Sequence, residues 1–349
     1  MDFVATTKQK KVVGHKLRSQ QTNVVIMQSI RPTTQAKDRY KLINWKEYNA
    51  GLCKRGSLTL WIAEPVLEVW EQIDASKKVV GEKLYPDSII LCCLTLGMQY
   101  HQKLRQTTGF VSSILTLLGK GHFSIPDYST LSRRQNILPV SISDRLNKGE
   151  NLDIAIGSTG LKVYGEGEWK VRQHGITKRR TWRKLHIVID VNTQEIICVD
   201  LTTNSQDDAS IATKMLKGKT EKLKSFRGDG AYDDFDFRKT LGKTVRQIIP
   251  PPKNAVLQKN TIKKPLPDYL EQRNEAVNFI NKQNRKQWKI QESYHKRSLN
   301  EVVMFRYKIT FGGNMNARKI ENQQTEVKIK CAILNKYSRI TMPISVKAA

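Results

Sequence analysis

The second half of the chain alternates extended and helical patterns in an order that few folds accommodate. Three apolar extended segments, at 152–160, 185–190 and 195–203, are joined by short links and predict an antiparallel meander. The elements that follow are a helix, a strand, a helix and a strand, at 207–217, 223–229, 236–241 and 244–249. This order predicts an α/β fold, since the extended pattern of the first three segments gives way to alternating helices and strands.

A later helix completes this order and carries Glu301. The sequence of elements is the one expected of a ribonuclease-H-like fold with a mixed five-stranded sheet. In that fold the ends of the first and fourth strands lie side by side, and the late helix packs against them. Asp229 ends the fourth strand within a glycine-flanked turn, which lets the backbone come close to a ligand.

The helix predicted at 294–308 places four polar side chains on one face. They are Tyr294, Arg297, Glu301 and Lys308. At about 100° per residue, these positions fall within a sector about 60° wide, whereas Leu299, Val302 and Val303 point elsewhere and can be buried. The face therefore presents a carboxylate flanked by cations that can bind phosphate. The alternative is an ordinary surface ion pair between Arg297 and Glu301, worth about 0.3–0.5 kcal/mol.

The charge of the chain favours a polyanionic partner. The 60 Lys and Arg residues outnumber 32 Asp and Glu residues and give a formal net charge of +28 at pH 7, which is typical of nucleic-acid binding. The five cysteines are scattered without metal-binding spacing and predict buried, reduced thiols in a cytoplasm. The longest apolar run, 88–98, is too short to cross a bilayer, and the N-terminus lacks the apolar core of a secretory signal, so we expect no membrane association.

The first 150 residues have a different pattern. Residues 1–40 are polar and basic, and we expect a partly disordered arm. Apolar residues at helical spacing predict an all-α region at 41–150, in which Pro126 and Asp127 begin a helix that carries Arg133 and Arg134. A helix, a short turn and a basic helix are typical of a helix-turn-helix DNA reader. Helices packed only for stability, with both arginines in solvent, remain an equal alternative.

Several separate motifs resemble one family. They are I-G-S-T-G-L-K-V-Y-G-E-G-E-W at 156–169, K-R-R-T-W-R-K-L-H at 178–186, G-D-G-A-Y-D at 228–233, and Y-x2-R-x3-E-x6-K from Tyr294. Together they resemble the transposases of bacterial insertion sequences that use an Asp-Asp-Glu triad, of the IS-five and IS-four type. The resemblance implies cleavage of DNA at terminal inverted repeats and strand transfer into target DNA. It also implies Mg²⁺ as the cofactor, with Mn²⁺ able to substitute, a homodimer on double-stranded DNA, and a place in the bacterial cytoplasm with the nucleoid.

The resemblance assigns roles to individual residues. Asp229 matches the second catalytic aspartate and Glu301 the glutamate, and both would bind metal; Tyr294, Arg297 and Lys308 match residues that position DNA phosphates. The first aspartate is replaced by Gly157, which offers no ligand. Two cations about 3.5–4 Å apart need bridging carboxylates, so we expect this chain to be catalytically impaired while it keeps the fold and DNA binding.

Two other aspartates lie near this position in the sequence. Asp153 is on the same strand face as Gly157 but about 13 Å away at 3.3 Å per residue, too far to replace the missing carboxylate. Asp190 ends a strand, and we assign it to the following hairpin turn rather than to the site. Neither is therefore expected to bind metal.

Further DNA contacts are expected outside the acidic site. In the basic stretch 170–184 the candidates are Arg172, Lys178, Arg179, Arg180, Arg183 and Lys184, with a solvated hairpin as the alternative. In the catalytic domain, predicted at 151–349, residues 250–287 have little apolar content and predict an insertion or a loop, in contact with DNA or with a second subunit. Two other functions remain open: a ribonuclease-H-like nuclease outside the transposase family, and a basic DNA-binding protein without enzymatic activity.

Overall fold

A mixed β-sheet forms the centre of the computed structural model, which describes residues 40–75, 85–146, 148, 150–163, 182–259, 261 and 265–348. Five strands follow the order β4-β3-β2-β5-β6. Their bounds are β2 (Leu152–Val163), β3 (Trp182–Asp190), β4 (Ile196–Thr203), β5 (Leu223–Arg227) and β6 (Arg246–Ile248). The pairs β2–β3 and β3–β4 are antiparallel, whereas β2–β5 and β5–β6 are parallel. The meander and the pairing of the first and fourth strands are confirmed, and a sixth strand that was not predicted, β7 (Asn314–Met315), pairs with β2.

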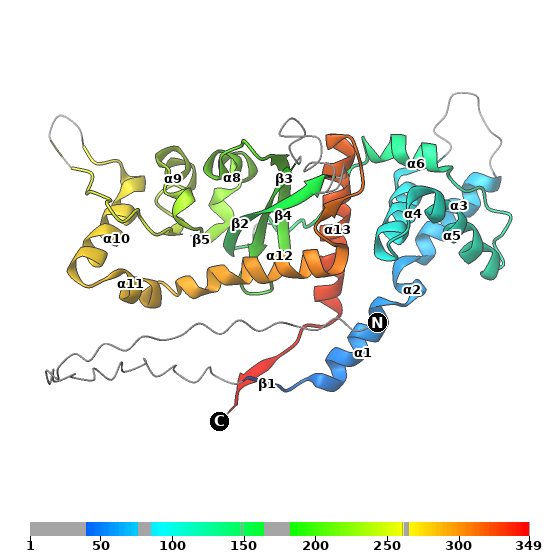
Figure 1. The fold of residues 1–349 in the computed structure, drawn as a ribbon, viewed down its shortest axis with the longest axis horizontal. Coiled ribbons are helices and arrows are strands. Elements are labelled where there is room, and N and C mark those ends of the chain that lie inside the picture. Colours follow the sequence, from blue (N-terminus) through cyan, green and yellow to red (C-terminus); the bar gives the residue numbers. More distant parts are fainter. Residues whose placement is uncertain are drawn as a thin grey trace, which may run out of the picture. The chain divides into compact units, whose positions relative to one another are not determined.

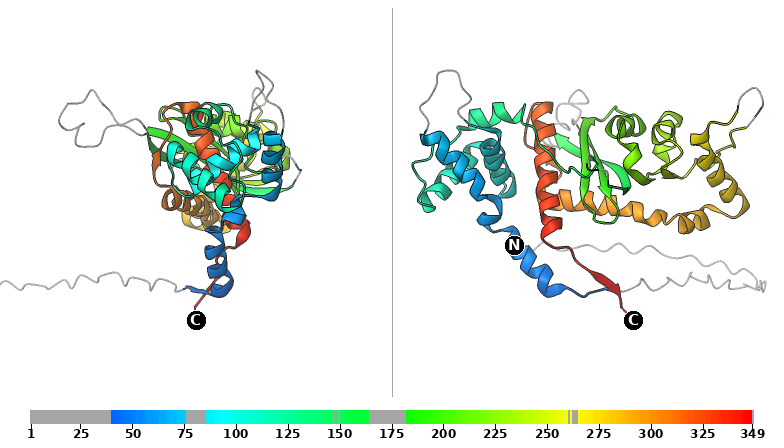
Figure 2. Two further views of the ribbon diagram at one scale, coloured as in Figure 1. Left: turned by 90° about the vertical axis from the view of Figure 1, so that its right-hand side faces the viewer. Right: turned by 180° about the vertical axis from the view of Figure 1, so that it is seen from behind.

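Helices cover both faces of the sheet (Figure 1; seen from behind in Figure 2). One face carries α8 (Asp208–Leu216) and α9 (Phe235–Leu241), and the other carries α12 (Ser298–Phe311) and α13 (Ile320–Ile340). Alternate side chains of a strand point to opposite faces. Ile154 and Ile156 of β2 accordingly pack with residues of α8 and α9, whereas Ala155 and Leu161 pack with residues of α12 and α13.

The part of the chain before the sheet is helical, as predicted. Its helices are α1 (Trp45–Arg55), α2 (Leu58–Trp61), α3 (Glu64–Ala75), α4 (Asp87–Gln99), α5 (Leu104–Leu117) and α6 (Tyr128–Gln135). The apolar run at 88–98 forms the buried helix α4. Asp127 begins α6 because its side chain accepts a hydrogen bond of 2.8 Å from the Ser129 backbone N–H.

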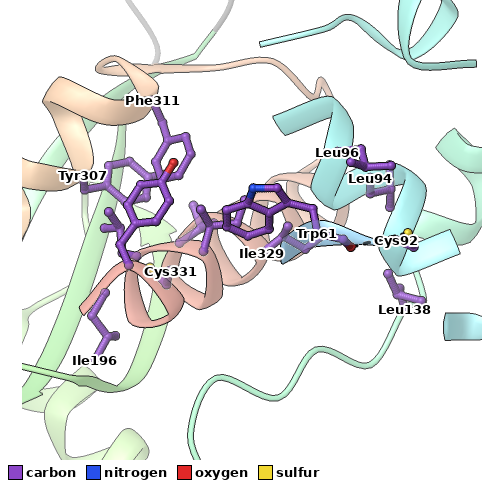
Figure 3. Close-up of a cluster of buried hydrophobic side chains, with 14 of the residues drawn as sticks. Trp61, Cys92, Leu94, Leu96, Leu138, Ile196, Tyr307, Phe311, Ile329 and Cys331 are labelled. Carbon is purple, nitrogen blue, oxygen red and sulfur yellow. Dashed lines mark hydrogen bonds between the residues drawn. The ribbon is translucent and has the colours of Figure 1, made fainter. Parts of the chain in front are cut away.

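Helix α13 packs against the sheet with one side and against the N-terminal helices with the other (Figure 3). A single hydrophobic cluster runs from Ile196 on β4 through Cys331 and Ile329 on α13 to Trp61 and Leu94. A helix with buried residues on most of its circumference is typical of the interior of a larger protein. Residues 41–150 and the sheet therefore share one core, and their action as separate domains stays a prediction.

The segment 250–287, predicted as an insertion or a loop, is partly helical. It includes a short 3₁₀ helix, η3 (Asp268–Leu270), the helix α10 (Glu271–Lys282) and the start of α11 (Arg285–Gln291). Ala276 and Trp288 bury their side chains against Ile248. Arg273 of α10 also donates to Asp233. The segment is a packed helical insertion, because its contacts with Ile248 and Asp233 stabilise it although few of its residues are apolar.

Two further expectations from composition concern the termini and the cysteines. Tyr40–Leu42 (β1) and Ser345–Lys347 (β8) pair as a separate two-stranded sheet. Of the arm predicted at 1–40, residues 1–39 lie outside the described residues, and Tyr40 belongs to β1. All five cysteines are unpaired, but Cys53 is exposed, so the prediction of buried thiols is wrong for that residue. Among the described helices, none has the length and apolar character needed to cross a membrane.

Candidate active site

The parallel pairing of β2 with β5 brings position 157 next to position 229. Ala155 lies opposite Arg227 in the register, so Gly157 and Asp229 follow two residues further along each chain. Asp229 comes directly after β5 and begins a 3₁₀ turn, η2 (Gly230–Tyr232), where its Oδ1 accepts a hydrogen bond of 2.9 Å from Ala231 N–H. The carboxylate of Asp229 is thus half-buried at the end of the strand beside Gly157.

Glu301 lies in the first turn of α12 and is exposed. Its Oε1 lies 2.5 Å from Nη2 of Arg297. The preceding residues Tyr294–Arg297 form a 3₁₀ helix, η4, so the prediction of one continuous α-helix from Tyr294 to Lys308 is wrong. Ser293, whose φ of 49° is in the left-handed region, precedes η4 and separates it from α11. The ion pair at the junction nevertheless keeps Arg297 and Glu301 together.

Arg297 is the centre of a charged cluster that includes both candidate catalytic acids. Burial alone would lower the pKa of Arg297, but Tyr294, Glu301 and Asp229 together raise it above its ordinary value. Burial raises the pKa of the Tyr294 hydroxyl, and the negative charges of Asp229 and Glu301 raise it further. The structure therefore brings together four of the residues that the sequence singled out, Asp229, Tyr294, Arg297 and Glu301, and η4 contacts both β2 and β5.

The face of α12 that packs on the sheet differs from the predicted stripe. Its buried residues are Asn300, Val303, Met304, Tyr307 and Phe311. Val302, which was expected to be buried, is 44% exposed. Asn300 was missed by the sequence analysis, although it shares the helical spacing of this stripe. Its Nδ2 donates to the carbonyl oxygens of Ala155 and Ile187, at 3.2 and 2.8 Å, and so ties α12 to β2 and β3.

The residues present do not fit a two-metal centre. Among the residues that the structure describes, no three His, Cys, Asp or Glu side chains are close enough together to hold a metal ion. Of the acids assigned to this site, Asp229 and Glu301 are present, and Glu301 is already paired with a cation. Gly157 is buried in β2 and contributes no oxygen from a side chain.

The two other aspartates considered from the sequence are engaged elsewhere. Asp153 accepts hydrogen bonds from Ser225 and Asn192. Asp190 lies in the β3–β4 turn, where its Oδ2 accepts from Arg145 Nη1 at 2.7 Å and from Thr193 Oγ1 at 2.8 Å. Both observations agree with the prediction that neither replaces the missing carboxylate.

The predicted DNA-binding cations fall into three groups. Arg172, Lys178, Arg179 and Arg180 lie outside the described residues. Arg183, Lys184 and Arg134 are held by the protein itself: Arg183 donates to Gln323, Lys184 lies 2.9 Å from Asp208, and Arg134 binds Asp87 and the Tyr85 carbonyl. Lys184 and Arg134 thus have carboxylate partners within the protein, and their contact with DNA stays a prediction. Arg133 and Lys308 are exposed and have no carboxylate within ion-pair distance among the described residues.

A cavity of about 970 Å³ lies between the N-terminal helices and the α12–α13 connection. Its lining includes five cations that have no ion pair with a described carboxylate: Lys103, Arg105, Arg133, Arg318 and Lys319. Asn322 also lines it and is 6% exposed, and its Oδ1 has no hydrogen-bond partner among the described residues. The cavity therefore offers positive charge to a ligand, and only Arg133 of these cations could be singled out from the sequence.

The strand order, with helices on both faces of the mixed sheet, defines the class as a protein of ribonuclease-H-like fold. Two family models, each described as a transposase DDE domain, match residues 53–166 and 149–336. Since the second match covers more than half of the chain, the protein belongs to the transposase DDE domain family. Enzymes of this family generally use divalent metal ions.

One solved structure is similar at a low level. It is the cryo-EM structure of a piggyBac transposase synaptic complex with hairpin DNA, with a TM-score of 0.24 and 10% sequence identity. The similarity covers 83% of this chain and 81% of that one. A similarity this low adds nothing to the family match.

Proposed function

We propose that this chain is the transposase of a bacterial insertion sequence that binds terminal inverted repeats but is impaired in strand cleavage and transfer. One observation carries the proposal. Asp229 and Glu301 both lie close to Arg297, whereas the neighbouring strand position, 157, has no side chain. Two of the three acidic residues of such a site are thus present.

The chemistry that is lost follows from the ligands that remain. Mg²⁺, or Mn²⁺ in its place, supplies the Lewis acid that activates the attacking oxygen when such a site is complete. Hard cations prefer carboxylate oxygens, and two of them need more than two carboxylates. Because Gly157 contributes none and Arg297 neutralises Glu301, we assign no catalytic step to a metal ion in this chain.

The residues that remain support binding of DNA phosphates. Arg297 is paired with Glu301, and its guanidinium carbon lies 5.8 Å from the centre of the Tyr294 ring. A planar hydrogen-bond donor is therefore fixed at the edge of the site. Lys308 lies further along α12 as an exposed cation. These groups would hold the DNA backbone near Asp229 without reading its sequence.

The cavity lined by Lys103, Arg105, Arg133, Arg318 and Lys319 is a second cationic surface. Arg105 is fixed by Tyr128, which accepts a hydrogen bond from it and whose ring lies 4.5 Å from the guanidinium carbon. Arg133 lies on the same helix as Tyr128 and lines the same cavity. We infer that α5 and α6 contact the inverted repeat here. A homodimer is part of the proposal because two transposon ends must be joined.

A binding titration tests this function. The probe is a duplex of the inverted repeat that flanks the coding region, and the control is a scrambled duplex of the same composition. We expect at least about a thousandfold preference for the repeat, which is the lower range for specific binding, and an affinity that falls steeply with salt. Equal affinity for the two duplexes would contradict a transposase and indicate a non-specific DNA-binding protein.

A further inference from the structure

The space on the helix side of Gly157 is filled by the amide of Asn300. A Cβ atom built on Gly157 would lie 2.8 Å from Asn300 Oδ1 and 3.1 Å from Met304 Cε. Real Cβ atoms essentially never have a neighbour within 3.0 Å, so a side chain at 157 requires something to move. Met304 is flexible and can give way. The question is whether Asn300 can.

Hydrogen bonds fix the orientation of the Asn300 amide. Asn300 is 1% exposed, and its Nδ2 donates to the carbonyl oxygens of Ala155 and Ile187. Turning the amide over would direct Oδ1 at these two acceptors and lose both hydrogen bonds. Oδ1 itself has no hydrogen-bond partner among the described residues. The oxygen atom is therefore held toward Gly157 by the contacts of the nitrogen atom.

An aspartate side chain at 157 would be hindered more strongly than the methyl group of an alanine there. Its carboxylate extends beyond Cβ into the region where the Asn300 oxygen lies, and both groups are hydrogen-bond acceptors. A buried charge next to an unpaired acceptor is unfavourable, since neither supplies a proton to the other. The side chain of Asn300 thus opposes a carboxylate at 157 by both its volume and its polarity.

We propose that Asn300 occupies the space that a carboxylate at 157 would need, so that residues 157 and 300 together keep the first carboxylate out of the site. Gly157→Asp alone then does not place a carboxylate beside Asp229 and Glu301, whereas Gly157→Asp combined with Asn300→Ala does. The packing part of this inference stands on the contacts of Gly157 and Asn300 alone. The part that concerns metal binding rests on the proposed function.

A double-mutant cycle tests the packing part on the full chain. At an unobstructed strand position, replacing glycine by alanine is stabilising. We expect Gly157→Ala instead to lower the melting temperature by at least about 2 °C, and to cause little or no loss when Asn300→Ala is also present. Additive effects of the two substitutions would overturn the inference.

Two further variants serve as a control and as a substitute in this cycle. Gly160→Ala on the same strand serves as the matched control, because its added Cβ would meet Trp182 rather than Asn300, and its effect should add to that of Asn300→Ala. Asn300→Ser keeps a donor for the strand carbonyls and replaces Asn300→Ala if that variant does not fold. Coupling of Gly160 with residue 300 as strong as that of Gly157 would also overturn the inference.

A titration with MnCl₂ tests the metal part. The melting temperature of Gly157→Asp should rise little with Mn²⁺, whereas that of the Gly157→Asp and Asn300→Ala double variant should rise by several degrees, because a ligand stabilises only the state that binds it. Equal shifts in the two variants, including none in either, would overturn the claim that Asn300 excludes a carboxylate from the site. Failure of the proposed function would appear separately, as a loss of preference for the inverted repeat.

Discussion

Arg297 directly precedes α12 and forms an ion pair with Glu301 in the first turn of this helix, with its Nη2 atom 2.5 Å from Oε1 of the carboxylate. The acid that the resemblance assigns to metal binding is therefore neutralised by the cation that it assigns to DNA. The negative charge of Asp229 also acts on Arg297 and helps to raise its pKa. With Gly157 as the third member of the site, this arrangement favours binding of a DNA phosphate over binding of two metal ions.

The first prediction concerns Arg297. Arg297→Gln should weaken binding of the inverted-repeat duplex about tenfold and reduce the slope of log affinity against log salt by about 1, because one phosphate contact is lost and Glu301 becomes an unpaired negative charge. Fluorescence anisotropy titrations at several salt concentrations measure both quantities. Arg246→Gln is the matched control, since Arg246 also lies 2.5 Å from a glutamate, Glu292. The same change of slope in both variants would remove Arg297 from the DNA interface.

The second prediction concerns the cationic cavity. Replacing Arg105 and Arg133 together by glutamine should reduce the salt slope by about 2, because each lines the cavity without a carboxylate partner among the described residues. The same titration measures this. Replacing the exposed Lys217 and Lys239 by glutamine is the control for the loss of two charges. If the control and the cavity variant lower the slope equally, the cavity does not bind DNA.

The third prediction concerns stability in acid. Burial would raise the pKa of Asp208, but hydrogen bonds with His186 and Lys184 lower it from its ordinary 3.8 to about 2. Because the folded pKa is lower than the unfolded one, the carboxylate contributes stability that is fully present above pH 3.8 and is lost as the pH falls to about 2.

Urea unfolding as a function of pH measures this contribution. Asp208→Asn should be less stable than the wild type at neutral pH, and the difference should shrink between pH 3.8 and about 2. Asp236→Asn replaces an exposed aspartate and should leave the profile unchanged. A constant difference between Asp208→Asn and the wild type across this range would disprove the assignment.

The fourth prediction concerns the packed insertion. Asp233 is buried between two arginines, with Oδ1 at 2.7 Å from Arg238 and 3.2 Å from Arg273. Asp233→Asn should lower the free energy of unfolding by about 3–5 kcal/mol, because two buried cations lose their carboxylate. Asp234→Ala, which removes only the N-cap of α9, should cost about 1 kcal/mol. Equal losses, measured by urea unfolding, would mean that the insertion is not anchored through Asp233.

The sequence predicts the sheet better than it predicts the site. Apolar runs and turn residues are local, so the strand order and the position of Asp229 after β5 could be predicted. The 3₁₀ turn at Tyr294–Arg297 could not, since its spacing also fits an α-helix. The contact of Asn300 with Gly157 joins residues far apart in the sequence, and only the packing of α12 on β2 reveals it. The same is true of Asp233 and Arg273, whose pairing stabilises a segment of low apolar content.

Strand transfer on the inverted repeats tests the central claim most directly. The wild type and the Gly157→Asp and Asn300→Ala double variant are compared in Mg²⁺ and in Mn²⁺ with the same labelled duplex. The account predicts that both proteins bind the duplex and that only the double variant cuts and joins it. Cleavage and transfer by the wild type at the rate of the double variant would contradict the claim that the absence of a carboxylate at 157 disables the site.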